Sequence, residues 1–430
     1  MIVNTCGWDT DCNSGNVGCI LGIKNGLATI DAGPDWRGPV ADRMYLPTAD
    51  GGRAITDAAT EAYHIVNVGR ALSGQEPVAP KDGARFHFEL PGSVQGFQPD
   101  DDQDFGGVLT VENMAGHSEA GSRSLALRYE HLAPGRVARV STPTFVPPEA
   151  TDMADYRLLA SPTLYPGQNV RARVVADEGN SGEVTCRLFV RVYGADDALW
   201  IHRGPEVILR PGSAHAFEWC VGDTGGQPIA SIGLELTSEC AASGSLYLDY
   251  VAWDGAPEVT LTRPAEGGTM WRRAWVNGVD RFDEHSPEPY RLVQNSGTGL
   301  LIQGTREWAD YEVSALVRPH MITSAGIAGR VQGMRRYYAL VLIQGDKVRL
   351  IKALDGDVVL AETGFSWHFD VTYELNLKVR GKCLRASIDG EEIFDVRDED
   401  RPLMGGAVAL VCEEGRTESE VVRVRPLGGG

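Results

Sequence analysis

Short runs that alternate apolar and polar residues make up much of this chain after residue 83. Examples are Phe86-His-Phe-Glu-Leu90, Thr185-Cys-Arg-Leu-Phe-Val-Arg-Val-Tyr193 and Ser245-Leu-Tyr-Leu-Asp-Tyr-Val251. Successive side chains of a strand point to opposite faces of a sheet, so a period of two predicts strands with one buried face. Clusters of Gly, Pro and Asp separate the runs, and no helical pattern intervenes. The pattern predicts antiparallel β-sandwiches.

Residues 1–80 show a different sequence pattern. Apolar residues recur at helical spacing in residues 16–27, and a second helix is expected over residues 56–72. Gly18 and Gly22 lie four residues apart and would allow one helix to approach another closely in a tightly packed bundle. We therefore predict a multidomain, predominantly β chain with three parts. These are a helical portion at 1–80, a sandwich at 84–256 and a second sandwich at 257–427.

The formal net charge of the chain is −19. Nucleic acids and anionic membranes attract proteins with a positive field, so the charge argues against both as partners. No apolar run approaches the roughly 20 residues of a membrane span. The charge is compatible with cations and with neutral ligands such as sugars.

The eight cysteines are scattered and form no CxxC pair. This spacing favours free thiols in a reducing compartment, and it slightly favours the cytoplasm. A bridge between Cys220 and Cys240 is the alternative, since two strands of one sheet could bring them together.

The most polar motif stands near the start, in the string CGWDTDCNSGNVG of residues 6–18. Asp9 and Asp11 are two residues apart in a Gly-rich turn that leads into a predicted helix. Two carboxylates at this spacing can reach one ion, and oxygen ligands suit Mg²⁺ or Mn²⁺. A solvated turn or a helix N-cap is the alternative interpretation of such a pair.

The longer string, continued by Ile20-Leu-Gly22, resembles the C-terminal signature of the ADP-ribosylglycohydrolase family, and the resemblance covers about residues 1–75. It implies an all-α bundle with one or two Mg²⁺ or Mn²⁺ ions, and hydrolysis of a glycosidic bond to ADP-ribose or a related ribosyl group. By this resemblance Asp9 and Asp11 would be metal ligands. Cys12 stands where the family has Thr or Ser, so that ligand is not carried over.

The family's other metal ligands lie on a segment upstream of this motif. Three interpretations follow: residues 1–75 are the tail of a catalytic domain whose N-terminal part is missing, a remnant kept for packing or completed by a separate chain, or a chance match. Under the first two, the isolated chain is expected to show little or no turnover.

The sandwich regions resemble accessory modules of bacterial glycosidases. The end of the first, Gly244-Ser-Leu-Tyr-Leu-Asp-Tyr-Val-Ala-Trp-Asp254, resembles the last strand of jelly-roll carbohydrate-binding modules. The second resembles concanavalin/laminin-G-like jelly rolls, in Gly326-Ile-Ala-Gly-Arg330 and Arg336-Tyr-Tyr-Ala-Leu340. Such modules commonly hold a structural Ca²⁺, to which the run Asp100-Asp-Asp-Gln-Asp104 could contribute, with a flexible acidic loop as the alternative.

Aromatic rings and arginines are the candidate sugar-binding groups, because a ring can stack on the apolar face of a sugar. The candidates are Trp271, Trp275, Trp308, Tyr337, Tyr338, Trp367, Arg330 and Arg336. Core packing is the alternative for each ring, and a solvated surface position is the alternative for each arginine. The leading hypothesis is the C-terminal part of an ADP-ribosylglycohydrolase-like hydrolase with glycan-binding sandwiches. A non-catalytic carbohydrate-binding protein with a vestigial helical segment is the alternative.

Overall fold

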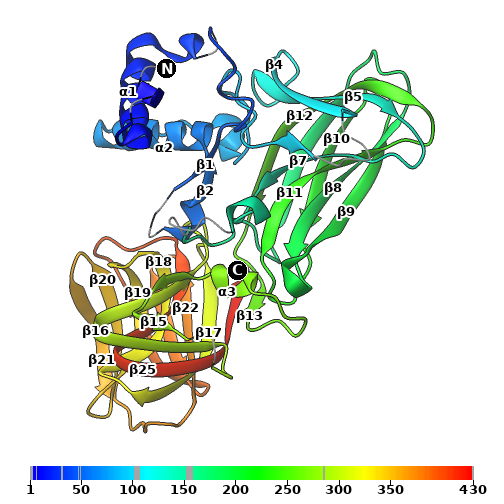
Figure 1. Ribbon diagram of the computed structural model, residues 1–430. Helices are drawn as coiled ribbons and strands as arrows, with labels where there is room; N and C mark the ends of the chain where they lie inside the picture. The colour runs from blue at the N-terminus through cyan, green and yellow to red at the C-terminus, as the bar shows by residue number, and fades with distance from the viewer. Residues whose placement is uncertain are drawn as a thin grey trace.

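The computed structural model describes residues 3–5, 7–30, 32–46, 48, 50–100, 107–151, 158–283 and 286–428. The N-terminal helices lie beside a first β region, and a second β region packs below both in the view of Figure 1. None of the helices in the described part of the chain has the length and apolar character that a membrane crossing needs.

The N-terminal segment contains two helices and a small hairpin. Its elements are α1 (Thr10–Asn25), β1 (Arg43–Tyr45), β2 (Ile55–Asp57) and α2 (Ala58–Leu72), with β1 and β2 paired antiparallel. Asp57 caps α2, because its side chain accepts a hydrogen bond from the Thr60 amide at 2.9 Å. Arg43 fixes this segment to the first β region by donating from Nε to the Gly96 carbonyl at 3.0 Å.

The first β region is a sandwich of two five-stranded antiparallel sheets. One sheet has the order β10-β7-β12-β5-β4 and the other the order β3-β6-β11-β8-β9. The strands of the first sheet are β4 (Leu109–Ala115), β5 (Arg123–Leu132), β7 (Asn169–Ala176), β10 (Ala214–Cys220) and β12 (Ala242–Asp254). Those of the second are β3 (Gln98–Pro99), β6 (Ala138–Pro143), β8 (Val184–Tyr193), β9 (Leu199–Leu209) and β11 (Ile229–Thr237). Alternate residues such as Leu127, Leu188 and Leu246 form one buried core between the sheets.

The second β region is a single antiparallel sheet of 13 strands that the long strand β25 (Ala407–Pro426) holds together. Strand β25 pairs with β16, β17, β18 and β13. A Cβ added at Gly415 would lie 1.7 Å from the Met321 carbonyl oxygen, so the strand needs glycine where it passes this neighbour.

The other strands of this sheet follow in chain order. They are β13 (Val259–Leu261), β14 (Val276–Gly278), β15 (Arg281–Phe282), β16 (Tyr290–Gln303), β17 (Tyr311–Met321), β18 (Ser324–Gly333), β19 (Arg336–Ile343), β20 (Lys347–Leu354), β21 (Asp357–Gly364), β22 (Tyr373–Arg380), β23 (Cys383–Ile388) and β24 (Glu391–Arg397). A one-turn helix, α3 (Met270–Arg273), precedes β14.

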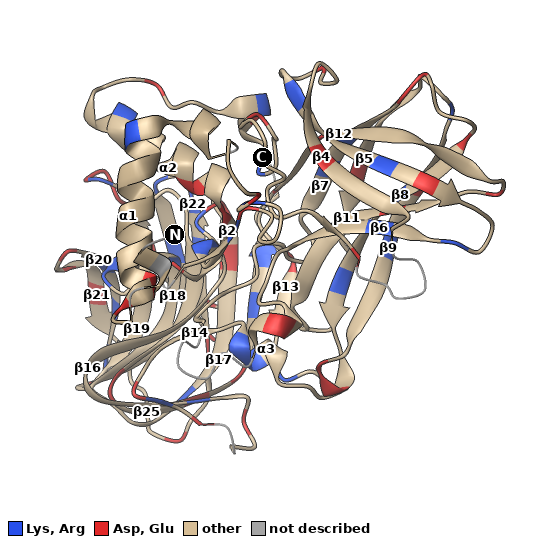
Figure 2. Ribbon diagram, turned by 45° about the horizontal axis from the view of Figure 1, so that its top comes forward, with Lys and Arg blue, Asp and Glu red and all other residues tan. Residues whose placement is uncertain are grey.

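The predicted fold class is confirmed: a short helical N-terminal part precedes predominantly antiparallel β regions. The strands of the second β region form one continuous sheet rather than two separate sheets, because β25 pairs with β17 and β18 and also with β13 and β16. The boundaries proposed near residues 80 and 256 stay predictions. Acidic and basic residues are interspersed along both β regions (Figure 2).

The expected close packing around Gly18 and Gly22 is wrong. Among the described residues, no atom beyond the helix's own nearby backbone lies within 4 Å of a Cβ built at either glycine, and α1 contains no buried residue. The small residues of α1 therefore face open space in the described structure.

Candidate functional site

A cleft of about 890 Å³ opens where α2, the following linker, the first sandwich and the start of the second β region meet. Its walls include residues 77–85 of the linker, strands β7 and β12, and Thr305 and Glu307 after β16. Ligand sites in proteins are commonly concave and of this size. This cleft is the candidate functional site.

Strands β7 and β12 form the floor of the cleft. Arg173 lies opposite Tyr250 in the register of the two strands, and Arg171 lies opposite Ala252. Because side chains alternate along β7, these arginines point outward while Ala172 packs in the core. The floor therefore combines a partly exposed phenol ring with guanidinium groups.

Helix α2 and the linker form the opposite wall. The Asn67 side chain accepts from the Val78 amide at 2.7 Å and donates to the Val78 carbonyl at 2.9 Å, which fastens the linker to the helix. One turn earlier, Tyr63 meets the ring of His87 edge-on, with 4.8 Å between the ring centroids. Burial lowers the pKa of His87 to about 4, and the nearby Lys81 charge acts in the same direction. His87 is therefore neutral at pH 7.

A buried ion pair fixes the linker to the sandwich. Lys81 Nζ donates to Asp249 Oδ1 at 2.6 Å, to the Asp249 carbonyl at 2.7 Å and to the Arg123 carbonyl at 2.5 Å. Both side chains are fully buried. Burial alone would raise the pKa of Asp249, but hydrogen bonds from Lys81 and Ser118 outweigh it and lower the pKa. The geometry of this wall thus depends on two charges that hold each other in place.

Four arginine–carboxylate pairs surround the cleft. Arg53 meets Glu61 at 2.5 Å, Arg171 meets Asp254 at 2.5 Å and Arg85 meets Glu307 at 3.2 Å, and Arg173 is paired with Glu119. The hydrogen bond that Arg173 donates to Glu119 raises the pKa of Arg173. Each pair places hydrogen-bond donors beside acceptors at the cleft surface.

The aromatic residues predicted to bind sugar lie elsewhere, in the interior of the second β region. Those buried there are Trp271, Trp275, Trp308, Tyr337, Tyr338 and Trp367. Trp308, for example, packs edge-on against Tyr165, with 4.8 Å between the ring centroids. The core covers the faces of these rings and leaves none of them open to a sugar. Buried rings of this size contribute strongly to core packing.

The two predicted arginines also lie outside the cleft. Arg330 is 1% exposed, and its guanidinium donates to backbone carbonyls of Gly381 and Leu403. Arg336 is exposed and pairs with Asp355 at 3.1 Å. The buried Arg330 therefore joins segments of the second β region.

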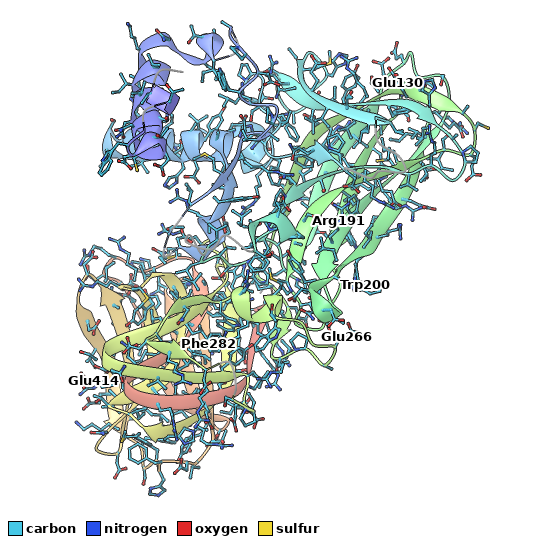
Figure 3. All side chains as sticks on the ribbon, in the orientation of Figure 1. Glu130, Arg191, Trp200, Glu266, Phe282 and Glu414 are labelled. Atoms are coloured by element: carbon cyan, nitrogen blue, oxygen red, sulfur yellow. The ribbon has the colours of Figure 1, made fainter. Side chains whose placement is uncertain are left out.

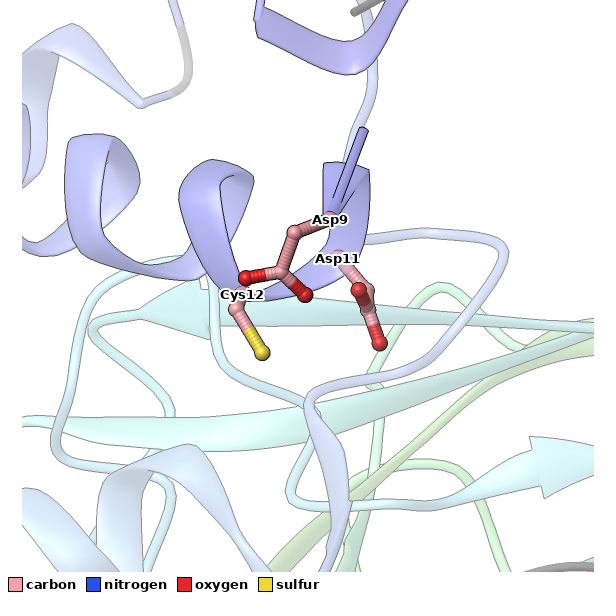
Figure 4. A group of neighbouring side chains, drawn as sticks. All are labelled: Asp9, Asp11 and Cys12. Carbon is pink, nitrogen blue, oxygen red and sulfur yellow. The ribbon is translucent and has the colours of Figure 1, made fainter. Parts of the chain in front are cut away.

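Asp9, Asp11 and Cys12 lie together at the start of α1 (Figure 4). One potential ligand atom from each lies within 4.8 Å of the others, and all three residues are exposed. Mg²⁺ takes six oxygen ligands and Cys12 offers a soft sulfur, so these residues supply two suitable donors. A hydrogen bond with Asp9 and the charges of Asp9 and Asp11 raise the pKa of the Cys12 thiol. The fit to Mg²⁺ or Mn²⁺ is thus partial, and the metal site stays a prediction.

Of the acidic run, Asp100 is paired with Arg191, which Figure 3 labels on β8, while residues 101–104 lie outside the described residues. The calcium site stays a prediction.

The alternative disulfide is wrong, because Cys220 and Cys240 are both free. Cys220 ends β10 at the end of the sheet where Asp254 lies, whereas Cys240 precedes the start of β12. The two thiols are at opposite ends of one sheet.

The residues of the cleft, including Tyr250, Arg171 and Arg173, are not among the site residues predicted from the sequence. The available signal was the run Val170-Arg-Ala-Arg-Val-Val175, which places two arginines on one outward face of a strand. Nothing in the sequence indicated that this face lies against α2 and the linker.

No protein-family model matches this chain, and no curated protein matches it. Among solved structures, the carbohydrate-binding module CBM66 from Bacillus subtilis has 14% identity over 35% of this chain and 94% of its own, with a TM-score of 0.33. The xylan-binding domain CBM22-1 from Paenibacillus barcinonensis Xyn10C has 15% identity over 39% of this chain and 90% of its own, with a TM-score of 0.28. The galectin LEC-6 from Caenorhabditis elegans has 12% identity over 34% of this chain and 94% of its own, with a TM-score of 0.23. Because these identities and TM-scores are low, a function has to be argued from the cleft of this chain itself.

Proposed function

We propose that this protein binds carbohydrate, and that the cleft between α2, the linker and strands β7 and β12 is its binding site. The observation that carries the proposal is the floor of the cleft, where the Tyr250 ring lies in register with Arg173 and beside the Arg171–Asp254 pair. A sugar has apolar ring faces that stack on aromatic side chains, and hydroxyls that both donate and accept hydrogen bonds.

The volume of the cleft supports the same proposal. About 890 Å³ is room for a short oligosaccharide rather than a single small ion. The buried Lys81–Asp249 pair and the Asn67–Val78 hydrogen bonds hold the two walls in place before a ligand arrives. A preformed site loses less conformational entropy when it binds.

The proposal is tested by measuring binding of the full chain to soluble polysaccharides by calorimetry and affinity electrophoresis. Xylan and β-glucan are suitable first probes, since one of the similar structures is a xylan-binding domain. We expect Tyr250→Ala to weaken binding about tenfold, because the lost stacking is worth about 1.4 kcal/mol.

Trp200→Ala is the matched control. This ring is 60% exposed on β9, in the other sheet of the same sandwich and outside the cleft (Figure 3). Its replacement should leave binding unchanged, and circular dichroism should show that both variants are folded. A loss of binding in Trp200→Ala but not in Tyr250→Ala would place the site on the sheet that contains β9 and would contradict the proposal. Absence of binding to any polysaccharide tested would refute the proposal.

The hydrolase hypothesis for residues 1–75 finds no support in the comparisons and stays a prediction. With two carboxylates at the start of α1, we expect no release of ADP-ribose by the purified chain in Mg²⁺ or Mn²⁺. Release that depends on the metal and disappears in Asp9→Ala and Asp11→Ala would support the hydrolase instead.

A further inference from the structure

The cleft is lined by equal numbers of acidic and basic residues, although the chain as a whole carries a net charge of −19. Five basic residues line it: Arg53, Lys81, Arg85, Arg171 and Arg173. Five acidic side chains line it as well: Glu61, Asp82, Glu119, Asp254 and Glu307. The excess negative charge of the protein therefore lies elsewhere on the molecule.

Each of the four arginines already has a carboxylate partner within the lining. The pairs come from different parts of the chain: Arg53–Glu61 from the α2 wall, Arg85–Glu307 from the linker and the second β region, and Arg171–Asp254 and Arg173–Glu119 from the floor. Lys81 is paired too, with Asp249 behind the lining. A charged ligand would thus meet four arginines whose charges are already compensated.

An anionic sugar would have to displace a protein carboxylate from an arginine, which leaves that carboxylate without its counter-charge. A cationic ligand would have to displace an arginine in the same way. A neutral hydroxyl displaces nothing. It can accept from a spare guanidinium N–H, of which arginine has five, and donate to a free lone pair of the paired carboxylate.

We infer that the four arginine–carboxylate pairs make the cleft selective for neutral glycans over acidic ones. This inference rests on the proposed function, because it concerns which carbohydrate the same cleft takes. The Arg173–Glu119 pair is the specificity-determining contact that is easiest to alter. The Glu119 side chain is 59% exposed, and its backbone amide, which donates to Asp249, is unchanged by substitution of the side chain.

The experiment compares xylan and β-glucan with polygalacturonate and alginate, using the full chain at 50 and 500 mM NaCl. For the unmodified protein we expect neutral-glycan affinity to change less than twofold with salt, and acidic-glycan affinity to be at least tenfold weaker. Glu119→Gln frees the charge of Arg173 and should raise acidic-glycan affinity at least fivefold at low salt. That gain should disappear at high salt, because salt screens the new attraction.

Glu206→Gln is the matched control. It removes the carboxylate from the Arg187–Glu206 pair, which lies on β8 and β9 outside the cleft. It should not change either class of affinity.

The outcomes separate the inference from the proposed function. Preferential, salt-sensitive binding of acidic glycans by the unmodified protein would overturn the inference and leave carbohydrate binding standing. An unchanged acidic-glycan affinity in Glu119→Gln, or an equal gain in Glu206→Gln, would overturn the assignment of selectivity to the cleft pairs. Absence of binding to both classes would overturn the proposed function itself.

Discussion

Helix α1 and strand β18 differ in how many of their residues are buried. The helix contains no buried residue, and its Ile23 is 88% exposed. The first eight residues of β18 are all buried. Helices of about 15 residues are marginal in water without tertiary packing. The contrast indicates that the β regions carry the stability of the described fold and that α1 contributes little to it.

Helix α2 lies between these extremes. Ala59 and Glu61 are buried, Asp57 caps its first turn, and Tyr63 contacts His87 at the edge of the first sandwich. Its outer residues, such as Leu72, are exposed. The helix that forms a wall of the cleft is thus the one that docks on a β region.

The largest expected effect is on the free energy of unfolding, and two tryptophans in different surroundings test it. Trp308 is fully buried in the second β region, whereas Trp8 next to α1 is 86% exposed. Trp308→Ala should lower the free energy of unfolding by about 4 kcal/mol, because it removes buried ring surface and leaves a cavity. Trp8→Ala should change it by less than about 0.5 kcal/mol. Urea titrations followed by circular dichroism measure both, and similar losses for the two variants would contradict the contrast.

A smaller effect concerns pH at the contact between α2 and the first sandwich. His87 has a pKa of about 4 in the folded chain and 6.5 as its ordinary value. Between these values the unfolded chain binds the proton more readily, so this contribution to stability is complete above pH 6.5 and is lost as the pH falls toward 4. The loss should be on the order of 3 kcal/mol.

His87→Asn tests this assignment. An asparagine oxygen can accept from the Glu89 amide, which now donates to His87 Nδ1 at 3.0 Å, but it does not titrate. Urea midpoints measured from pH 7.5 to 4 should fall less steeply for the variant. Parallel profiles would show that His87 does not cause the acid sensitivity.

The smallest expected effect is on the stability of the first turn of each helix, where the two N-caps differ. The Asp57 side chain accepts from the Thr60 amide, whereas Asp9 makes no side-chain capping bond at the start of α1. Asp57→Ala should destabilise the first turn of α2 by about 1 kcal/mol. Hydrogen exchange should show faster exchange at Thr60, and Asp9→Ala should leave exchange in α1 unchanged. Faster exchange in α1 would reveal a cap that the structure does not contain.

Much of the fold could be predicted from the sequence because strand and helix periods are local properties. The alternation in residues 185–193 and 245–251 corresponds to β8 and part of β12, and the helix expected at 56–72 corresponds to α2. The site could not be predicted in this way. A ring such as Trp308 or Tyr250 has the same chemistry in a core and in a cleft, and only the packing of distant segments decides which surrounds it.

The sequence by itself determined the β-rich class, the helical N-terminal segment and the acidic charge of the protein, since these follow from local pattern and composition. Only the tertiary structure decided that Tyr250 and the four arginine–carboxylate pairs meet in one cleft. Those residues come from segments as far apart as Arg53 and Glu307, and their proximity depends on how α2, the linker and the two β regions pack together. Contacts of that kind have no local sequence period.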